Sequence, residues 1–334
     1  MVVVTGGTGL VGSHLLLYLV KKNQKIIAIK RSDKNLKNVI NLFSFFYPNE
    51  YKKMFDKIIW KKGDILDYDF LQNITKNAKK IFHCAALISF DSSKKKMMKK
   101  VNVEGTKNIV DVALENKIEK LCYVSSITVM GEEEKNTYIT EETERTNEKN
   151  YYYSQTKFEA ELEVWRAIAE GLNAVIVNPS IIFGIGDFKN GSLTFFNTVY
   201  NGLPFYTSGK TAFVDVKDLV KIMIELMESD ISNERFIVSE NNYFYKEILE
   251  KIAKHLNKRA PKILANSFLL SIFWRLEFLR SKLFFAEPKI TKETAILSQK
   301  ISMYSNEKIK KRLNFSFKSM DKTIKEISEF ILKK

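Results

Sequence analysis

A glycine turn near the start of the chain constrains the fold more than any other feature of the sequence. The β-branched run at residues 2–4 has no polar alternation, which is typical of a strand buried on both faces of a parallel sheet. Gly6, Gly9 and Gly12 follow at regular spacing, and residues 13–22 then have the leucine pattern of a helix. The sequence therefore predicts a strand, a tight turn and a helix N-terminus in immediate succession.

A turn of this kind is suited to binding a phosphate. Its backbone N–H groups and the positive end of the helix dipole would face an anion. Glycine is needed because a Cβ atom would block the turn or the approach of the ligand. An ordinary glycine-rich turn is the alternative, but the strand before it and the helix after it are the context that a dinucleotide site requires. We therefore predict a dinucleotide pyrophosphate site formed by Gly6, Thr8, Gly9, Leu10, Val11 and Gly12.

The end of the next predicted strand, at residues 25–29, bears on which dinucleotide binds. An acid at that point would hydrogen-bond the ribose 2′-hydroxyl of NAD. Here Lys30 and Arg31 come first, and the acid Asp33 follows them. A guanidinium binds a 2′-phosphate through two parallel hydrogen bonds, whereas the alternative is that both cations belong to an ordinary lysine-rich surface. The sequence favours NADP(H) over NAD(H).

Strands and helices alternate along the rest of the first half of the chain. Apolar runs predict four further strands, at 58–60, 80–86, 121–126 and 174–179, and a helix over 102–116. Alternation of this kind indicates a parallel sheet with helices on both faces. The predicted fold class is α/β, a doubly wound Rossmann sheet with a smaller, mostly helical C-terminal substrate domain.

Length and composition limit the alternatives. The 334 residues are 45% hydrophobic, which suits one large domain or two coupled ones. A core strand at residue 2 leaves no room for a signal peptide. Cys84 and Cys122 lie in predicted buried strands, and neither they nor the scattered histidines have the spacing of a disulfide framework or a metal site. These features predict a reduced, cytoplasmic protein without a metal.

The net charge of +15 raises the hypothesis of a nucleic-acid partner. The lysines, however, are spread along the whole chain, and no recognisable nucleic-acid module accompanies them. An anionic cofactor or a membrane surface would use the same charge. We therefore expect no nucleic-acid partner.

A second group of residues provides the chemistry. Ser126 comes at the C-terminal end of a predicted strand, the edge at which α/β sheets bind ligands. Tyr153 and Lys157 lie four residues apart on a helix predicted over 153–169, so their side chains share a face. A free tyrosine has a pKa of about 10, and a nearby ammonium favours the phenolate and lowers that pKa.

A structural tyrosine and an ordinary strand-end serine are the alternatives, because Tyr-x-x-x-Lys is frequent by chance. Behind a dinucleotide turn and a strand-end serine, the pattern instead favours catalysis. We predict that Tyr153 gives or takes a proton and that Ser126 hydrogen-bonds the substrate oxygen. Lys157 is predicted to assist the proton transfer by favouring the phenolate of Tyr153.

Over nearly its whole length the chain resembles the extended short-chain dehydrogenase/reductases, the NAD-dependent epimerase/dehydratase superfamily. The resemblance is carried by TGGTGLVGSHL at 5–15, GDILD at 63–67, HCAAL at 83–87, VNVEGT at 101–106, YVSSITVMG at 123–131, YYYSQTK at 151–157, NPSIIFG at 178–184 and FVDVKDLV at 213–220. Within that superfamily it looks most like the dihydroflavonol-4-reductase and 3β-hydroxysteroid dehydrogenase branch, where NPSIIFG-type segments are usual.

The resemblance implies roles for further residues. Ser126, Tyr153 and Lys157 take the catalytic positions of the family, and Tyr153 and Lys157 would also contact the cofactor. The remaining cofactor contacts that it implies are Asp64 and Ile65 beside the adenine, Ala85 and Ala86 under the cofactor, Asn102 reaching it from a helix, and Pro179 and Ile182 at the nicotinamide end.

One departure from the family bears on the substrate. Sugar-nucleotide enzymes of the superfamily commonly have an arginine two residues before the aromatic of the segment that matches 213–216, and this chain has Thr211 there. The stretch 185–210 is rich in aromatic residues rather than cations, although Lys210 remains a candidate. The sequence therefore favours hydride transfer to or from an apolar carbonyl or alcohol. A nucleotide-sugar epimerase or dehydratase is the main alternative, and a non-catalytic NADP-binding sensor or scaffold is disfavoured because serine, tyrosine and lysine are all present.

The predicted domains are a Rossmann unit, 1–178 with 213–238, and a substrate unit, 179–212 with 239–334. Phe195, Phe196, Phe205 and a helix over 264–283 are predicted to wall the pocket. The sequence is compatible with a homodimer.

The apolar residues of that last helix recur at three- and four-residue steps, as Leu264, Phe268, Ile272, Leu276, Leu279 and Leu283. A core helix of the small domain is the simplest interpretation. There are two alternatives. The helix could form a wall of the substrate pocket, or the segment 263–286 could make a peripheral membrane contact with Arg275, Arg280 and Lys282 at the headgroups.

Overall fold

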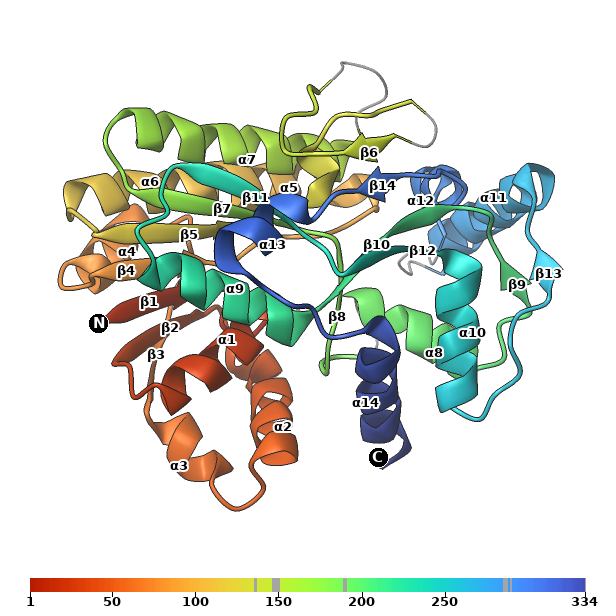
Figure 1. Ribbon diagram of the computed structural model, residues 1–334, viewed down its shortest axis with the longest axis horizontal. Helices are drawn as coiled ribbons and strands as arrows, with labels where there is room; N and C mark the ends of the chain where they lie inside the picture. Colours follow the sequence, from red (N-terminus) through yellow and green to blue (C-terminus); the bar gives the residue numbers. More distant parts are fainter. Residues whose placement is uncertain (135–136, 146–150, 189–190, 285–287, 289, 334) are drawn as a thin grey trace.

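A sheet of seven parallel strands forms the centre of the molecule in this computed structural model, which describes residues 1–134, 137–145, 151–188, 191–284, 288 and 290–333. The strand order is β11-β7-β5-β4-β1-β2-β3 (Figure 1). The strands are β1 (Val2–Thr5), β2 (Ile26–Lys30), β3 (Ile58–Lys62), β4 (Lys80–His83), β5 (Lys120–Val124), β7 (Ala174–Pro179) and β11 (Glu234–Val238). This arrangement confirms the predicted doubly wound α/β fold.

The order of the strands reverses at β1, which pairs with β2 on one side and with β4 on the other. A sheet of this kind binds ligands beyond the carboxyl ends of the strands at the reversal. Two of the predicted strands end earlier than their apolar runs, because residues 84–86 and 125–126 continue past the sheet edge. Those extra residues therefore lie where the ligand site is expected.

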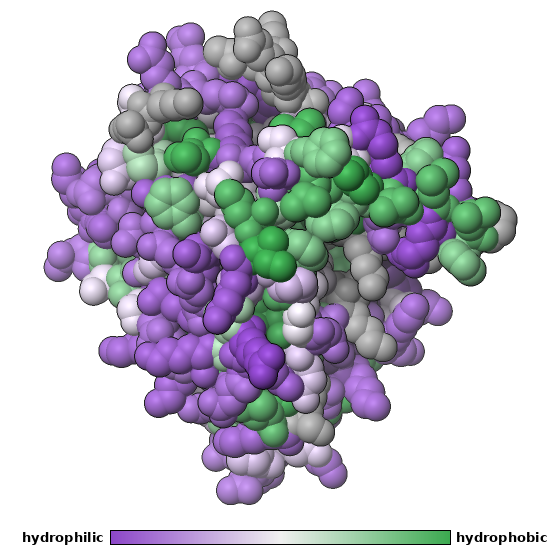
Figure 2. Space-filling model, turned by 90° about the vertical axis from the view of Figure 1, so that its right-hand side faces the viewer, coloured by the Kyte–Doolittle hydropathy of each residue, from purple (hydrophilic) through white to green (hydrophobic). Residues whose placement is uncertain are grey.

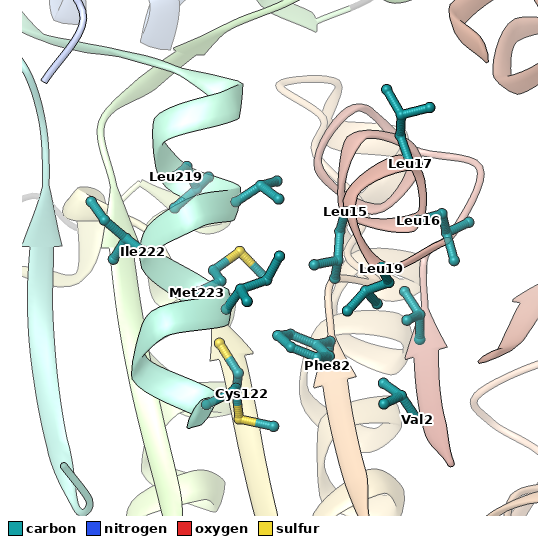
Figure 3. Packing of buried hydrophobic residues seen from close by; sticks show 14 of the residues in the cluster. Val2, Leu15, Leu16, Leu17, Leu19, Phe82, Cys122, Leu219, Ile222 and Met223 are labelled. Carbon is teal, nitrogen blue, oxygen red and sulfur yellow. The ribbon is translucent and has the colours of Figure 1, made fainter. Parts of the chain in front are cut away.

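Helices cover both faces of the sheet. On one face lie α1 (Leu10–Lys21), α2 (Leu36–Phe46), α3 (Tyr51–Asp56), α9 (Val216–Glu228) and α13 (Glu307–Leu313). On the other lie α4 (Tyr68–Thr75), α6 (Gly105–Glu115) and α7 (Tyr152–Ala169). The valines of β1 alternate between these cores, since Val2 and Val4 join the first and Val3 the second. In Figure 3 the side chains of α1 and α9 meet over Phe82 and Cys122 of the sheet.

A second lobe, on the right in Figure 1, is built on a smaller sheet of order β12-β10-β8. Its strands are β8 (Ile181–Phe183), β10 (Lys210–Asp215) and β12 (Asn241–Phe244), and its helices are α8 (Thr194–Tyr200), α10 (Tyr245–His255) and α14 (Met320–Leu332). Phe183, Phe196 and Phe213 are fully buried in its core. The chain therefore crosses from the small sheet at β10 back to the central sheet through α9 and β11.

The remaining elements connect and extend these two parts. They are α5 (Lys95–Lys99), α11 (Ser267–Leu283), α12 (Lys292–Leu297), β6 (Tyr138–Ile139) paired with β14 (Met303–Tyr304), and β9 (Phe205–Tyr206) paired with β13 (Ile263–Leu264). The helix predicted over 102–116 begins as a π-helical turn at Lys100–Glu104 and continues as α6. Such turns are frequent at functional sites.

The helix predicted over 264–283 differs from expectation at its start and on its outer face. Ile263 and Leu264 form β13, and α11 begins at Ser267, where the Asn266 side chain accepts a hydrogen bond from the Leu269 amide. Phe268, Ile272, Leu276, Leu279 and Leu283 are exposed. Their interpretation as core positions is therefore wrong, because periodicity alone does not tell an inward stripe from an outward one. Residues 285 and 286 of the range 263–286 lie outside the described residues. Of the helices that the structure describes, none has the length and apolar character to cross a bilayer.

Candidate active site

The glycine turn packs so tightly that side chains would not fit at two of its positions. Gly6 has a φ of +66°, and a Cβ atom there would lie 2.7 Å from the Ala85 amide nitrogen. A Cβ atom on Gly12 would lie 2.2 Å from the carbonyl oxygen of Gly6. Gly9 precedes α1 at its N-cap position, and no side chain caps that end of the helix. The cradle fits a dinucleotide pyrophosphate, because uncapped N–H groups and the positive helix end face the space that the glycines leave.

The two cations after β2 have different surroundings. The Lys30 ammonium lies 2.6 Å from a carboxylate oxygen of Asp33, and this hydrogen bond lowers the pKa of that carboxyl. Arg31 is exposed, and within the described part of the chain it has no ion-pair partner. Arg31 is therefore the better candidate for a 2′-phosphate, since the charge of Lys30 is already partly compensated.

The residues expected near the adenine differ in exposure. Asp64 is partly exposed, and one of its carboxylate oxygens accepts a hydrogen bond from the Leu66 amide. Ile65 is buried against α6, where a Cβ atom on Gly105 would come within 2.5 Å of its terminal methyl group. Their implied contacts with the cofactor remain predictions.

Asn102 holds the segment that follows β4 in place. Its side-chain oxygen accepts from the Leu87 amide at 2.7 Å, and its side-chain nitrogen donates to the Leu87 carbonyl at 3.0 Å. The same nitrogen donates to the Thr156 hydroxyl of α7 at 3.0 Å. Ala85 is partly exposed and Ala86 fully exposed on this segment. The geometry therefore gives Asn102 a positioning role beside the cofactor contact that the resemblance implies.

The structure brings Ser126 and Tyr153 together. Ser126 follows β5 and Tyr153 lies in the first turn of α7, and the Ser126 hydroxyl is close enough to the phenol to affect its pKa. The Thr128 amide and hydroxyl both donate to the Ser126 oxygen, at 3.2 and 3.0 Å, which leaves the Ser126 proton directed elsewhere. Burial raises the pKa of Tyr153 to about 12, although the Ser126 hydroxyl opposes this shift.

Lys157 is anchored on β5 and not on Tyr153. Its ammonium donates to the Tyr123 hydroxyl at 2.7 Å and to the Val124 carbonyl at 2.8 Å, and the residue is 2% exposed. Burial lowers the pKa of Lys157 to about 7, against the opposing charge of Glu161. The expectation that Lys157 lowers the pKa of Tyr153 differs from the structure, because desolvation of the phenolate dominates at Tyr153.

A chain of hydrogen bonds next to the glycine turn was not predicted from the sequence. The Thr106 hydroxyl donates to the Asn102 carbonyl at 2.6 Å, so it accepts from Nε2 of His83, which lies 3.0 Å away. The Thr5 hydroxyl accepts from the Ala85 amide at 3.1 Å, so its proton goes to Nδ1 of His83 at 2.7 Å. These contacts assign a neutral His83 that joins β1, β4 and α6. His83 belongs to the segment HCAAL, which carries part of the family resemblance. No residue near it in the sequence, however, indicates that Thr5 and Thr106 are its partners.

A buried carboxylate supports the other side of the site. Glu161, on α7, accepts from the Ser125 hydroxyl at 2.5 Å and from the Asn178 side chain at 2.8 Å, and it forms an ion pair with Arg235. The Asn178 side chain also donates to the Ser126 carbonyl at 3.2 Å. Glu161 therefore joins the carboxyl ends of β5 and β7 to Arg235 near the start of β11, next to the buried Pro179 that is expected at the nicotinamide end.

The aromatic residues predicted to line the pocket are mostly structural. Phe196 is fully buried in the core of the second lobe, so its assignment to the pocket wall is wrong. Phe195 stacks on Tyr245 within the same core, and Phe205 packs edge-on against Phe273 of α11. Phe90 instead lies beside the proposed catalytic tyrosine, with its ring centroid 6.4 Å from that of Tyr153.

A parallel sheet of this order, with a tyrosine and a lysine one helical turn apart beside a strand-end serine, is the architecture of the extended short-chain dehydrogenase/reductases. The model of the NAD dependent epimerase/dehydratase family matches residues 2–239, and the chain belongs to that family. It is accordingly an enzyme of the nicotinamide-dependent oxidoreductase type, as the expected family and fold require.

Relatives within the family act on different substrates. A putative dihydroflavonol 4-reductase of Synechocystis is 28% identical over 267 residues, covering 78% of this chain and 73% of that protein. UDP-glucose 4-epimerase of Vibrio cholerae is 24% identical over 289 residues, covering 82% and 81%. The crystal structure of gox2253 superposes with a TM-score of 0.81 at 24% identity, covering 100% of this chain and 98% of that one, which shows the shared fold.

Proposed function

We propose that this enzyme is an NADP(H)-dependent reductase that exchanges a hydride with the carbonyl or secondary alcohol carbon of an apolar substrate. The observation that carries the proposal is the placement of the Ser126 hydroxyl beside the Tyr153 phenol, next to the ring of Phe90. When bound, the nicotinamide supplies or accepts the hydride.

The residues of the chain account for the proton. Because burial raises the pKa of Tyr153 to about 12, its phenol keeps its proton at neutral pH and donates it to a carbonyl oxygen. The Ser126 oxygen accepts twice from Thr128, so its own proton is directed toward the phenol in the resting enzyme and would turn to orient the carbonyl when a substrate binds. Lys157 and Glu161 fix the position of α7 relative to β5, and therefore the positions of both hydroxyls.

Two further features support the cofactor and the substrate class. Arg31 is exposed at the end of β2, where a 2′-phosphate would be bound. Ile88, Phe90 and Met97 are exposed apolar side chains on the segment that leads from β4 past Tyr153. The Synechocystis relative is described as a reductase, which agrees with a carbonyl substrate.

A nucleotide-sugar epimerase or dehydratase is the second candidate, because the Vibrio cholerae epimerase aligns with more of this chain than the reductase does, 82% against 78%. Thr211 in place of the expected arginine argues against it, since a diphosphate without paired cations is costly to desolvate. Lys210, the remaining candidate cation for a diphosphate, is partly exposed, and its ammonium lies over the ring of Phe244.

The division into a Rossmann unit, 1–178 with 213–238, and a substrate unit, 179–212 with 239–334, also remains our proposal. The free thiols of Cys84 and Cys122 support the further proposal that the enzyme works in the reducing cytoplasm.

The proposed function is tested by following NADPH absorbance with a panel of apolar ketones, flavonoids and sterols. In parallel, calorimetry with UDP, dTDP and UDP-glucose in the presence of NADP tests the second candidate. Turnover of an apolar carbonyl without sugar-nucleotide binding is expected. Micromolar binding of any of these nucleotides would put the second candidate first.

A further inference from the structure

The outer face of α11 is an apolar surface that the rest of the described chain leaves uncovered. Its stripe consists of Phe268, Ile272, Leu276, Leu279 and Leu283, which are between 38% and 73% exposed. At 3.6 residues per turn these five positions span roughly 80° of the helix circumference. Hydrophobic surface gathers in the upper right of the face shown in Figure 2, which is the side of the molecule that carries α11 in Figure 1.

The opposite face of α11 explains how the helix is held. Leu270 is buried with Ala265 and Ala295, and Phe273 and Trp274 pack against them. The helix is therefore apolar on both sides. One side is covered by the protein, and the stripe faces outward at the cost of exposing large side chains to water.

The charges on α11 and in the segment that precedes it indicate what covers the stripe. The segment 258–282 carries six cations, Lys258, Arg259, Lys262, Arg275, Arg280 and Lys282, and one acid, Glu277. Glu277 is itself paired with Arg280 at 2.6 Å. On the helix, Arg275 and Lys282 are exposed and border the stripe on one side. A partner for this surface must therefore be apolar within and anionic at its rim.

We propose that α11 docks on the surface of an anionic phospholipid bilayer, with its stripe among the acyl chains and its cations at the headgroups. An interfacial helix has this combination of an apolar stripe and flanking cations, and it lies in the membrane without crossing it. A second copy of the chain fits less well, because a symmetric contact would place the same six-cation segment against itself. The proposal is independent of the reaction that the enzyme catalyses.

Co-sedimentation of the full chain with lipid vesicles tests this docking. Vesicles of phosphatidylcholine alone are compared with vesicles that also contain phosphatidylglycerol. The wild-type chain is expected to bind the anionic vesicles, to bind the neutral ones less and to be released by salt. Failure to bind anionic vesicles, or equal binding to both kinds, would overturn the proposal.

Two leucines of similar exposure provide a matched pair of variants, because Leu279 is 56% exposed on the stripe and Leu332 is 51% exposed at the end of α14. We expect Leu279→Glu to lower partitioning roughly tenfold, since it removes a leucine that would insert among the acyl chains and sets an acid against anionic headgroups, while Leu332→Glu changes it little. Lys282→Glu and Lys311→Glu form a second pair with equal change in net charge, and the first is expected to weaken binding more.

Equal effects within each pair would show that binding follows the diffuse charge of the whole chain, which contradicts the proposal. Dimerisation that Leu279→Glu abolishes, without vesicle binding, would assign the stripe to a second copy instead. Thermal unfolding of each variant checks that the fold is retained.

Discussion

The Lys157 ammonium and the Tyr123 hydroxyl are joined by a hydrogen bond of 2.7 Å, buried between α7 and β5. The same strand leads directly to Ser126, whose hydroxyl contacts Tyr153. Strand β5 therefore anchors both the lysine and the serine, and it sets their positions relative to the phenol.

The buried position of Lys157 should make stability depend on alkaline pH. Burial lowers its pKa in the folded chain to about 7, whereas an unfolded lysine titrates near 10.4. Between these values the unfolded chain binds the extra proton, so the free energy of unfolding rises with pH, by at most about 1.4 kcal/mol per pH unit. Urea unfolding from pH 7 to 9.5 should show this gain over a Lys157→Met variant. Parallel pH profiles of the two proteins would contradict the assignment.

The glycine turn predicts unequal effects of alanine at two of its positions. A Cβ atom on Gly12 would lie 2.2 Å from the Gly6 carbonyl oxygen, whereas one on Gly9 would lie 3.3 Å from it. We expect Gly12→Ala to abolish binding of NADPH and Gly9→Ala to weaken it, as measured by cofactor fluorescence. The reverse order would mean that the turn is not the pyrophosphate site.

Arg31 should decide between the two cofactors. Loss of a bidentate phosphate contact, together with a new repulsion, should cost NADPH roughly 2–4 kcal/mol of binding free energy in Arg31→Asp. NADPH is expected to bind the parent chain more tightly than NADH, and the variant to reverse that order. Arg259→Asp changes net charge equally and should leave the preference unaltered. Equal affinities in the parent chain would remove the basis for NADP.

His83 should contribute to acid unfolding. Burial, aided by the charge of Lys157, lowers its pKa to about 3, below the unfolded value near 6.5. Between these values the unfolded chain is protonated and the folded chain is not, so stability falls as pH falls through this window. His83→Leu removes one hydrogen bond each from the buried hydroxyls of Thr5 and Thr106, at about 1–3 kcal/mol each near pH 7. The stability gap between variant and wild type should therefore narrow toward pH 4, and a constant gap would contradict the neutral histidine.

The parts of the molecule that sequence predicts are those with local signals. Three features were predicted correctly because each is defined by residues that are close together in the sequence. They are the strand at Val2–Thr5, the glycine turn, and the placement of Tyr153 and Lys157 on one helix. The partners that join His83 and Glu161 to other strands and helices are 17 to 78 residues away, so only the fold brings them together. The orientation of α11 was unpredictable for another reason, because an inward and an outward stripe have the same periodicity.

The most direct test of the account is Tyr153→Phe, measured with a carbonyl substrate from the NADPH screen. The change keeps the ring and removes the hydroxyl that meets Ser126, so cofactor affinity should stay within about twofold while turnover falls ~10²–10⁴-fold. Lys157→Ala serves as the comparison and should impair both quantities, because Lys157 holds β5 and is expected to contact the cofactor. Full turnover by Tyr153→Phe would show that this phenol is not the proton donor and would contradict the proposed mechanism.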